Sequence, residues 1–146
     1  MVLICLLPTL RAADSTPYRL EAESLERAAA TARSENRHML IAFLGEGWSV
    51  RCKRFKEQVL ETMEFEDYAR DHLVYFPVEA RRRPKLTSEE TAVLQSWVVH
   101  FDIKAYPTFI LLAPDGQELL RHGYKDMNAR EYVELLQAIL PGQSGD

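Results

Sequence analysis

Apolar and polar positions follow two different patterns along the chain. Continuous apolar or β-branched runs bounded by glycine, proline or charge are typical of buried strands, whereas apolar residues recurring every three or four positions are typical of amphipathic helices. The pattern predicts helices over residues 22–33, 49–63, 87–100 and 128–140, and strands over residues 39–44, 72–78, 108–112 and 118–122. This order predicts a layered α/β domain with parallel strands first, an antiparallel hairpin last and a final helix.

Capping and turn residues support these boundaries. Ser49 and Thr87 stand where helix N-caps are expected, and Glu90 completes a capping-box spacing with Thr87. Pro114-Asp115-Gly116 separates the last two strand patterns and predicts a tight turn. Two apolar stripes are expected in the core, namely Val50, Phe55, Val59 and Met63, and then Trp97, Phe101 and Ile103.

Composition and charge narrow the class of protein. The chain has 146 residues, 47% of them apolar and 27% charged, which suits one globular domain. Eighteen Lys plus Arg against 22 Asp plus Glu give a net charge of -4. This balance argues against a nucleic-acid partner bound through its phosphates. The four histidines lack metal-ligand spacing and there are only two cysteines, so we expect no metal and no cofactor.

The N-terminal residues form a separate segment. Residues 2–10 are mostly apolar and are followed by one arginine and two alanines, as in the hydrophobic region and cleavage zone of a signal peptide. The run is too short to span a bilayer. We therefore expect a signal peptide over residues 1–13, a domain over residues 18–140, a disordered tail over residues 141–146, and a periplasmic or secreted protein. The alternative is an N-terminal segment that is never removed.

Two short segments resemble a known family. Trp48-Ser49-Val50-Arg51-Cys52 lies at a predicted strand-to-helix junction, and Tyr106-Pro107-Thr108 leads into the hairpin. Together they resemble the thioredoxin fold, which places Trp-Cys-x-x-Cys at that junction and a cis-proline opposite it. Residues 41–69 are similar to exported disulfide reductases of the DsbH type. The resemblance implies a central mixed sheet flanked by helices and a site formed by Trp48, Tyr106, Pro107 and Thr108 around the motif.

The motif departs from the family pattern at its first cysteine. Ser49 stands there, so the motif reads S-x-x-C, and a buried aspartate of the family is replaced by Ala42. Dithiol exchange needs both sulfurs, because the second thiol resolves the mixed disulfide formed by the first. We therefore expect dithiol turnover to be absent, with Ser49 as a helix N-cap. A cysteine in the natural protein that was changed to Ser49 is a third interpretation.

Cys52 leaves two functions open. It is either a small buried residue or a reactive single thiol, depending on whether the helix N-terminus or burial dominates. In the first hypothesis, Cys52 exchanges with exported proteins or peptides that carry thiols or disulfides, or with a redox partner protein. In the alternative, the chain is a non-catalytic binding module that holds an extended segment beside Pro107. The basic loop over residues 80–85 is either solvated or a contact for an acidic partner or a phospholipid headgroup.

Overall fold

The computed structural model describes residues 20–82 and 85–140, so the predicted signal peptide and C-terminal tail lie outside the described residues. Within these ranges, no helix has the length and apolar character needed to cross a membrane. The elements are α1 (Ser24–Ser34), β1 (His38–Leu44), α2 (Val50–Phe55), the π-helical turn η1 (Lys56–Leu60), α3 (Met63–His72), β2 (Leu73–Glu79), α4 (Ser88–His100), β3 (Thr108–Leu112), β4 (Glu118–His122) and α5 (Ala129–Ile139).

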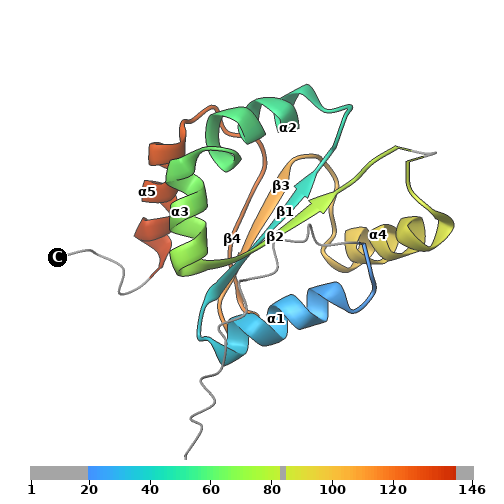
Figure 1. The fold of residues 1–146 in the computed structure, drawn as a ribbon, viewed down its shortest axis with the longest axis horizontal. Helices are drawn as coiled ribbons and strands as arrows, with labels where there is room; N and C mark the ends of the chain where they lie inside the picture. The colour runs from blue at the N-terminus through green and yellow to red at the C-terminus, as the bar shows by residue number, and fades with distance from the viewer. Residues whose placement is uncertain (1–19, 83–84, 141–146) are drawn as a thin grey trace, which may run out of the picture.

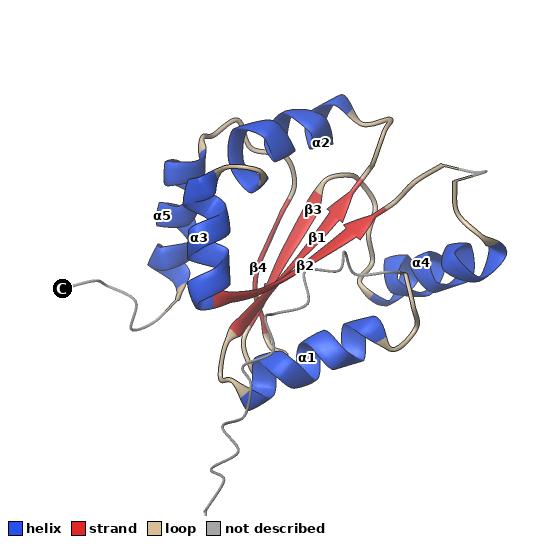
Figure 2. Ribbon diagram, in the orientation of Figure 1, coloured by secondary structure: helices blue, strands red, loops and turns tan. Residues whose placement is uncertain are grey.

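The described strands form one mixed sheet in the order β2-β1-β3-β4. β1 pairs in parallel with β2 and antiparallel with β3, and β3 continues antiparallel into β4. Helices cover both faces, with α1 and α4 on one side and α2, α3 and α5 on the other (Figures 1 and 2). This arrangement confirms the predicted layered α/β fold, including its hairpin and final helix.

The central strand β1 explains why its sequence is continuously apolar. Alternate side chains point to opposite faces of a strand, and here each face meets a separate core. Leu40, Ala42 and Leu44 join the core beneath α2, α3 and α5. The intervening residues of β1 join the core beneath α1 and α4. A strand covered on both faces has no polar side, which is why β1 lacks the alternation of an exposed strand.

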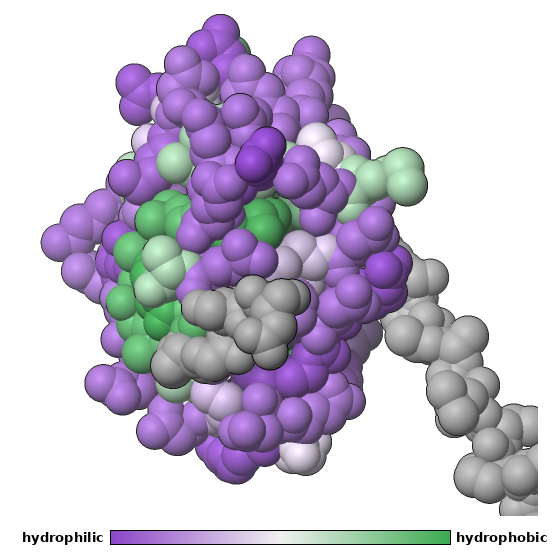
Figure 3. Space-filling view, turned by 90° about the vertical axis from the view of Figure 1, so that its left-hand side faces the viewer, coloured by the Kyte–Doolittle hydropathy of each residue, from purple (hydrophilic) through white to green (hydrophobic). Residues whose placement is uncertain are grey.

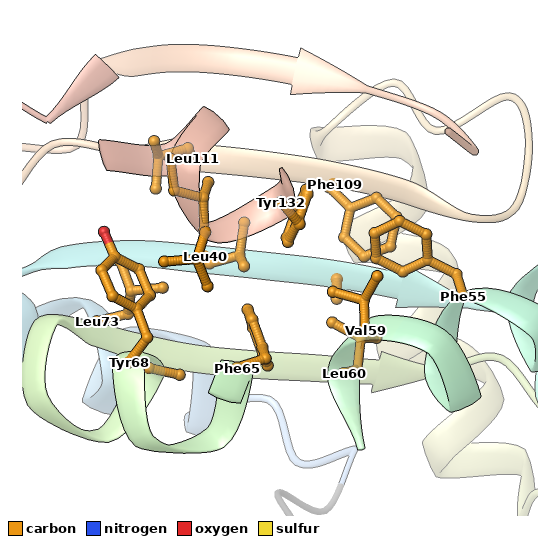
Figure 4. Packing of buried hydrophobic residues seen from close by; sticks show 14 of the residues in the cluster. Leu40, Phe55, Val59, Leu60, Phe65, Tyr68, Leu73, Phe109, Leu111 and Tyr132 are labelled. Carbon is orange, nitrogen blue, oxygen red and sulfur yellow. The ribbon is translucent and has the colours of Figure 1, made fainter. Parts of the chain in front are cut away.

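Aromatic rings hold α2 against the sheet and α5. The Phe55 ring lies 4.6 Å from that of Phe109 on β3 and 5.1 Å from that of Tyr132 on α5 (Figure 4). Cys52 stands one helical turn before Phe55, and both side chains are buried. Anchoring Phe55 therefore turns the Cys52 side of α2 toward the sheet.

The single helix predicted over residues 49–63 is wrong. The helical segment ends after η1, and a new helix, α3, begins at Met63. Thr62 caps α3 by accepting a 3.3 Å hydrogen bond from the Phe65 backbone N–H. A π-turn holds an extra residue and rotates the later positions of the chain relative to α-helical spacing. The predicted stripe is only half buried. Met63, which follows the π-turn at the start of α3, is 78% exposed, and Val50, at the first position of α2, is 75% exposed.

Polar side chains cover most of the side that carries α3 and α5, with one apolar area among them (Figure 3). α5 itself is amphipathic, since Tyr132, Val133 and Leu136 are buried. Leu135 and Ile139 are partly buried and pack against the edge of the same core. The helix therefore faces the sheet through one stripe, as its sequence predicts.

Candidate functional site

The site lies where β1 passes into α2. The strand ends at Leu44, a short loop comes next, and Ser49 takes the N-cap position. The Ser49 Oγ accepts a 3.3 Å hydrogen bond from the Cys52 backbone N–H. This bond satisfies one amide that the first helical turn would otherwise leave unpaired, and the predicted capping role of Ser49 is confirmed.

Cys52 is enclosed by the core at the start of α2. Its side chain is 1% exposed, and its Sγ accepts a 3.2 Å hydrogen bond from the Gly45 backbone N–H. It is the one cysteine in the part of the chain that the structure describes. In this conformation the sulfur is therefore almost completely shielded from solvent.

Gly45 allows that loop to fold tightly. A Cβ at this position would lie 2.7 Å from Cζ2 of Trp48 and 2.9 Å from Cβ of Ser49. Both distances are shorter than van der Waals contact, so only glycine fits without displacing the ring. Gly47 comes two residues later with φ of +77°, a backbone conformation that glycine adopts without steric cost.

Trp48 is the aromatic centre of the site. Its Nε1–H donates a 2.7 Å hydrogen bond to the Ala80 carbonyl oxygen, just after β2. Its ring meets that of Tyr106 edge to face, with centroids 5.4 Å apart. The Arg82 guanidinium lies 4.7 Å from the Trp48 ring centre. Trp48 thus connects three loops that are far apart in the sequence.

The second predicted segment lies beside this aromatic pair. The Tyr106–Pro107 peptide bond is cis. Burial raises the pKa of Tyr106, and interaction with Cys52 raises it further. Thr108 opens β3 opposite Phe43, and its Oγ1 donates to the Ala105 carbonyl oxygen at 2.7 Å. The structure therefore brings Tyr106 together with Trp48 and Cys52, while Thr108 serves the local turn.

A pocket of about 410 Å³ opens on the α2 side of Ser49. Lys56 lines it, with its Nζ 2.8 Å from a Glu46 carboxylate oxygen and 3.6 Å from one of Glu61. Burial alone would lower the pKa of Lys56, but its contacts with Glu46 and the neighbouring acids outweigh burial and raise it. The lining residues are Gly45, Glu46, Gly47, Trp48, Ser49, Val50, Lys53, Lys56, Glu57 and Glu61.

Sequence reasoning did not predict this pocket, although two features of it were visible. Charged residues recur at helical spacing after Ser49, and Glu46 stands shortly before the motif. The sequence pattern did not indicate that Glu46 and Lys56, ten residues apart, lie within hydrogen-bond distance of each other. Within residues 20–82 and 85–140, no three His, Cys, Asp or Glu side chains are placed to share a metal ion.

Known proteins share this chain's sequence pattern over most of its length. The family model described as a thioredoxin-like domain matches residues 25–140. Disulfide bond reductase DsbH of Chlamydia pneumoniae is 22% identical over 129 residues, which cover 88% of this chain and 75% of that protein. Thioredoxin-related protein DsbJ of the same organism is 29% identical over 126 residues, 80% of this chain, which spans about a third (34%) of DsbJ.

Solved structures share the fold at low sequence identity. A DsbH oxidoreductase superimposes with a TM-score of 0.75 at 19% identity, covering 92% of this chain and 94% of that one. The oxidised C-terminal domain of DsbD from Neisseria meningitidis superimposes with a TM-score of 0.63 at 15% identity, covering 86% of this chain and all (100%) of that domain. These likenesses confirm the fold that the two short segments predicted.

Proposed function

This chain belongs to the thioredoxin-like family of disulfide oxidoreductases, and from that premise we propose that it exchanges one thiol, Cys52, with thiol- or disulfide-bearing proteins. The proposal excludes a dithiol cycle. One observation carries it: Ser49 occupies the N-cap position before α2, and Cys52 is the one thiol that the described domain holds. The DsbH-type relatives supply the class of chemistry, and the S-x-x-C motif limits how far that chemistry proceeds.

The proposed reaction has two steps that need different thiols. The Cys52 thiolate attacks a disulfide of the partner, so a Cys52–partner disulfide forms and the other partner sulfur leaves as a thiolate. In a dithiol enzyme a neighbouring thiolate then breaks this mixed disulfide. The Ser49 hydroxyl is not a thiol and cannot do so. A low-molecular-weight thiol instead attacks the partner sulfur, joins it in a new disulfide and releases the Cys52 thiolate.

Several features of the site support thiol exchange at Cys52. The Gly45 N–H points at the sulfur that must carry negative charge in the attacking state, and hydrogen bonds to a charged acceptor are stronger than those to a neutral one. Tyr106, adjoining Trp48, precedes the cis Pro107 and the start of β3, and an extended partner segment would pair with this stretch of backbone outside the strand. Because Cys52 is buried, exchange also requires a local opening that exposes its sulfur. We expect such exchange to be slow with small disulfides.

The proposed setting is outside the cytoplasm. Residues 2–10 have the apolar character of a signal peptide, and disulfide-bearing protein partners accumulate in oxidising compartments. Exported proteins with thiols or disulfides are therefore the partners proposed for Cys52, as is a redox partner protein. Fusing residues 1–20 to a reporter that is active only after export tests the location directly.

Mixed-disulfide formation tests the single-thiol chemistry. The full chain carrying Cys5→Ser, so that Cys52 is its one cysteine, is incubated with oxidised glutathione, and its intact mass is followed over time. We expect one glutathione adduct, which a reducing agent removes and which the added variant Cys52→Ala abolishes. A folded protein that gains no adduct, with glutathione or with a disulfide-bearing peptide, would contradict the proposal.

A second measurement tests the role of Ser49. Reduction of insulin disulfides by dithiothreitol requires the mixed disulfide to be resolved at every turnover. Without a second active-site thiol this resolution depends on dithiothreitol itself, so we expect the unaltered chain to be much slower than Ser49→Cys. Ser49→Cys restores the missing sulfur and is expected to gain turnover, while Ser49→Cys with Cys52→Ala is not. Turnover by the unaltered chain equal to that of Ser49→Cys would show that the hydroxyl is no barrier.

A further inference from the structure

Two cationic side chains, those of Arg82 and Lys85, lie next to Trp48 and Gly47. The Arg82 guanidinium stacks 4.7 Å from the centre of the Trp48 ring. The Lys85 Nζ lies 4.0 Å from the point where a Cβ on Gly47 would stand. Both residues belong to the loop between β2 and α4, which the Trp48 Nε1–H bond to Ala80 ties to the site. Arg82 and Lys85 are therefore part of the rim of the site.

These two charges are not neutralised by neighbouring carboxylates. Arg81, in the same loop, pairs with Glu79 at 2.7 Å. Glu46, the acid nearest in sequence to Trp48, pairs with Lys56 instead. Within residues 20–82 and 85–140, neither Arg82 nor Lys85 forms an ion pair. A local positive rim thus stands out on a chain whose net charge is -4.

Stacking prepares Arg82 to recognise an anion. A guanidinium that lies over an aromatic ring keeps its charge and its in-plane N–H donors. Because the ring contact already restricts the side chain, less conformational entropy is lost when those donors bind a carboxylate. Lys85 adds a second donor group from the same loop. Two cations beside an extended binding edge complement acidic side chains spaced along a peptide.

We propose that Arg82 and Lys85 select protein partners whose cysteine is flanked by aspartate or glutamate. The inference rests on the proposed function for the docking of a partner segment beside Trp48 and Tyr106. The new element is the chemical class of that segment, which is acidic. The occupant is an acidic stretch of a protein, because the aromatic and backbone edge suits an extended polypeptide and the rim supplies the matching charge.

Binding of labelled peptides tests this selection without any thiol chemistry. Two extended peptides, with serine at the cysteine position and either Glu or Gln around it, are titrated into full-length Cys52→Ala protein and followed by fluorescence anisotropy. An exposed charge pair changes affinity about two- to fivefold, so two pairs give the Glu peptide an advantage of about tenfold. Raising the salt concentration is expected to reduce that advantage.

Matched variants identify which charges act. Arg82→Gln and Lys85→Gln are each expected to reduce the advantage of the Glu peptide about threefold. Arg81→Gln removes the same charge from the same loop but from a residue paired with Glu79, so it should keep the advantage. Thermal unfolding of each variant shows whether it folds.

Four outcomes would overturn the inference. These are equal affinity for the two peptides, no binding of either, an equal loss in Arg81→Gln, and tighter binding of an acidic polysaccharide than of the Glu peptide. Because the binding assay contains no reactive Cys52, its result is independent of the glutathione assay. A preference for the Glu peptide without any Cys52 adduct would reject the proposed function and retain the charge selection. An adduct without the preference would do the reverse.

Discussion

The backbone N–H of Gly45 donates a 3.2 Å hydrogen bond to the Sγ of Cys52. The same glycine leaves no space for a side chain, because the Trp48 ring and the Cβ of Ser49 occupy it. One residue therefore supports the buried sulfur through its backbone and the aromatic cover through its missing side chain. The position of the thiol and the position of the ring are linked by this loop.

Gly45→Ala is expected to displace both the Cys52 thiol and the Trp48 ring. Its Cβ would lie 2.7 Å from the Trp48 ring, and overpacking of this kind costs about 1–3 kcal/mol of folding free energy. Urea unfolding measures the loss. A change in tryptophan emission relative to the unaltered chain, with buried Trp97 as a common background, reports displacement of the Trp48 ring. Gly123→Ala is a matched control, since its Cβ would meet the Pro107 carbonyl oxygen at an ordinary 3.6 Å. Equal stability of the two variants would contradict the close fit at Gly45.

Local signals predicted most of the fold because their causes are local. The capping box at α4 forms as expected, with Glu90 accepting from the Thr87 backbone N–H at 2.8 Å and the Thr87 side chain accepting in return. The hairpin turn also forms, and Gly116 takes φ of +92° there. Each signal involves residues within four positions of one another, so a sequence pattern can contain it completely.

The remaining features depend on contacts that no local pattern contains. Arg82 reaches Trp48 from a loop 34 residues later in the chain, and the pairing of Glu46 with Lys56 requires the tight turn at Gly45. The break after η1 had a local signal in Thr62, which is a good capping residue. The apolar stripe continued across it in sequence and concealed the change of helix.

Replacing Ser49 by alanine tests its capping role separately from its place in the motif. The Ser49 Oγ accepts from the Cys52 backbone N–H at 3.3 Å, so we expect Ser49→Ala to lose about 1 kcal/mol of stability. Ser49→Asp keeps a capping oxygen and is expected to recover most of that loss. Urea unfolding of the three proteins provides the comparison. Alanine and aspartate variants of equal stability would mean that the cap contributes little.

The corrected helix boundary predicts unequal effects along the former stripe. Val59 is 0% exposed, so Val59→Ala should cost about 2 kcal/mol through lost burial and a residual cavity. Met63 is 78% exposed, and Met63→Ala should change stability by less than about 0.5 kcal/mol. Thermal or urea unfolding measures both. A large loss at Met63 would restore the single-helix interpretation.

His122 is a half-buried titratable group whose ring contacts Phe109 and Tyr132, two aromatic residues of the core that also holds Cys52. Its Nδ1 lies 2.7 Å from the Gly123 carbonyl oxygen and its Nε2 lies 3.0 Å from the Tyr132 hydroxyl oxygen. Its ring stacks on Phe109, with centroids 4.9 Å apart. A carbonyl only accepts, so in the neutral ring Nδ1–H donates to Gly123 and Nε2 accepts from the Tyr132 hydroxyl.

Acidification should therefore destabilise the fold through His122. Burial lowers the pKa of His122 below its ordinary 6.5, and the charge of Lys125 lowers it further against the opposing Gly123 hydrogen bond. As the pH decreases below 6.5, the unfolded chain consequently binds more protons than the folded one. The free energy of unfolding therefore decreases as the pH decreases, until the folded ring is also protonated.

Urea unfolding at pH 7.5 and 5.5 should show a smaller loss of stability for His122→Gln than for the unaltered chain. His38, whose pKa burial also lowers, contributes equally to both proteins. Parallel stability curves for the two proteins would show that His122 does not carry the pH dependence.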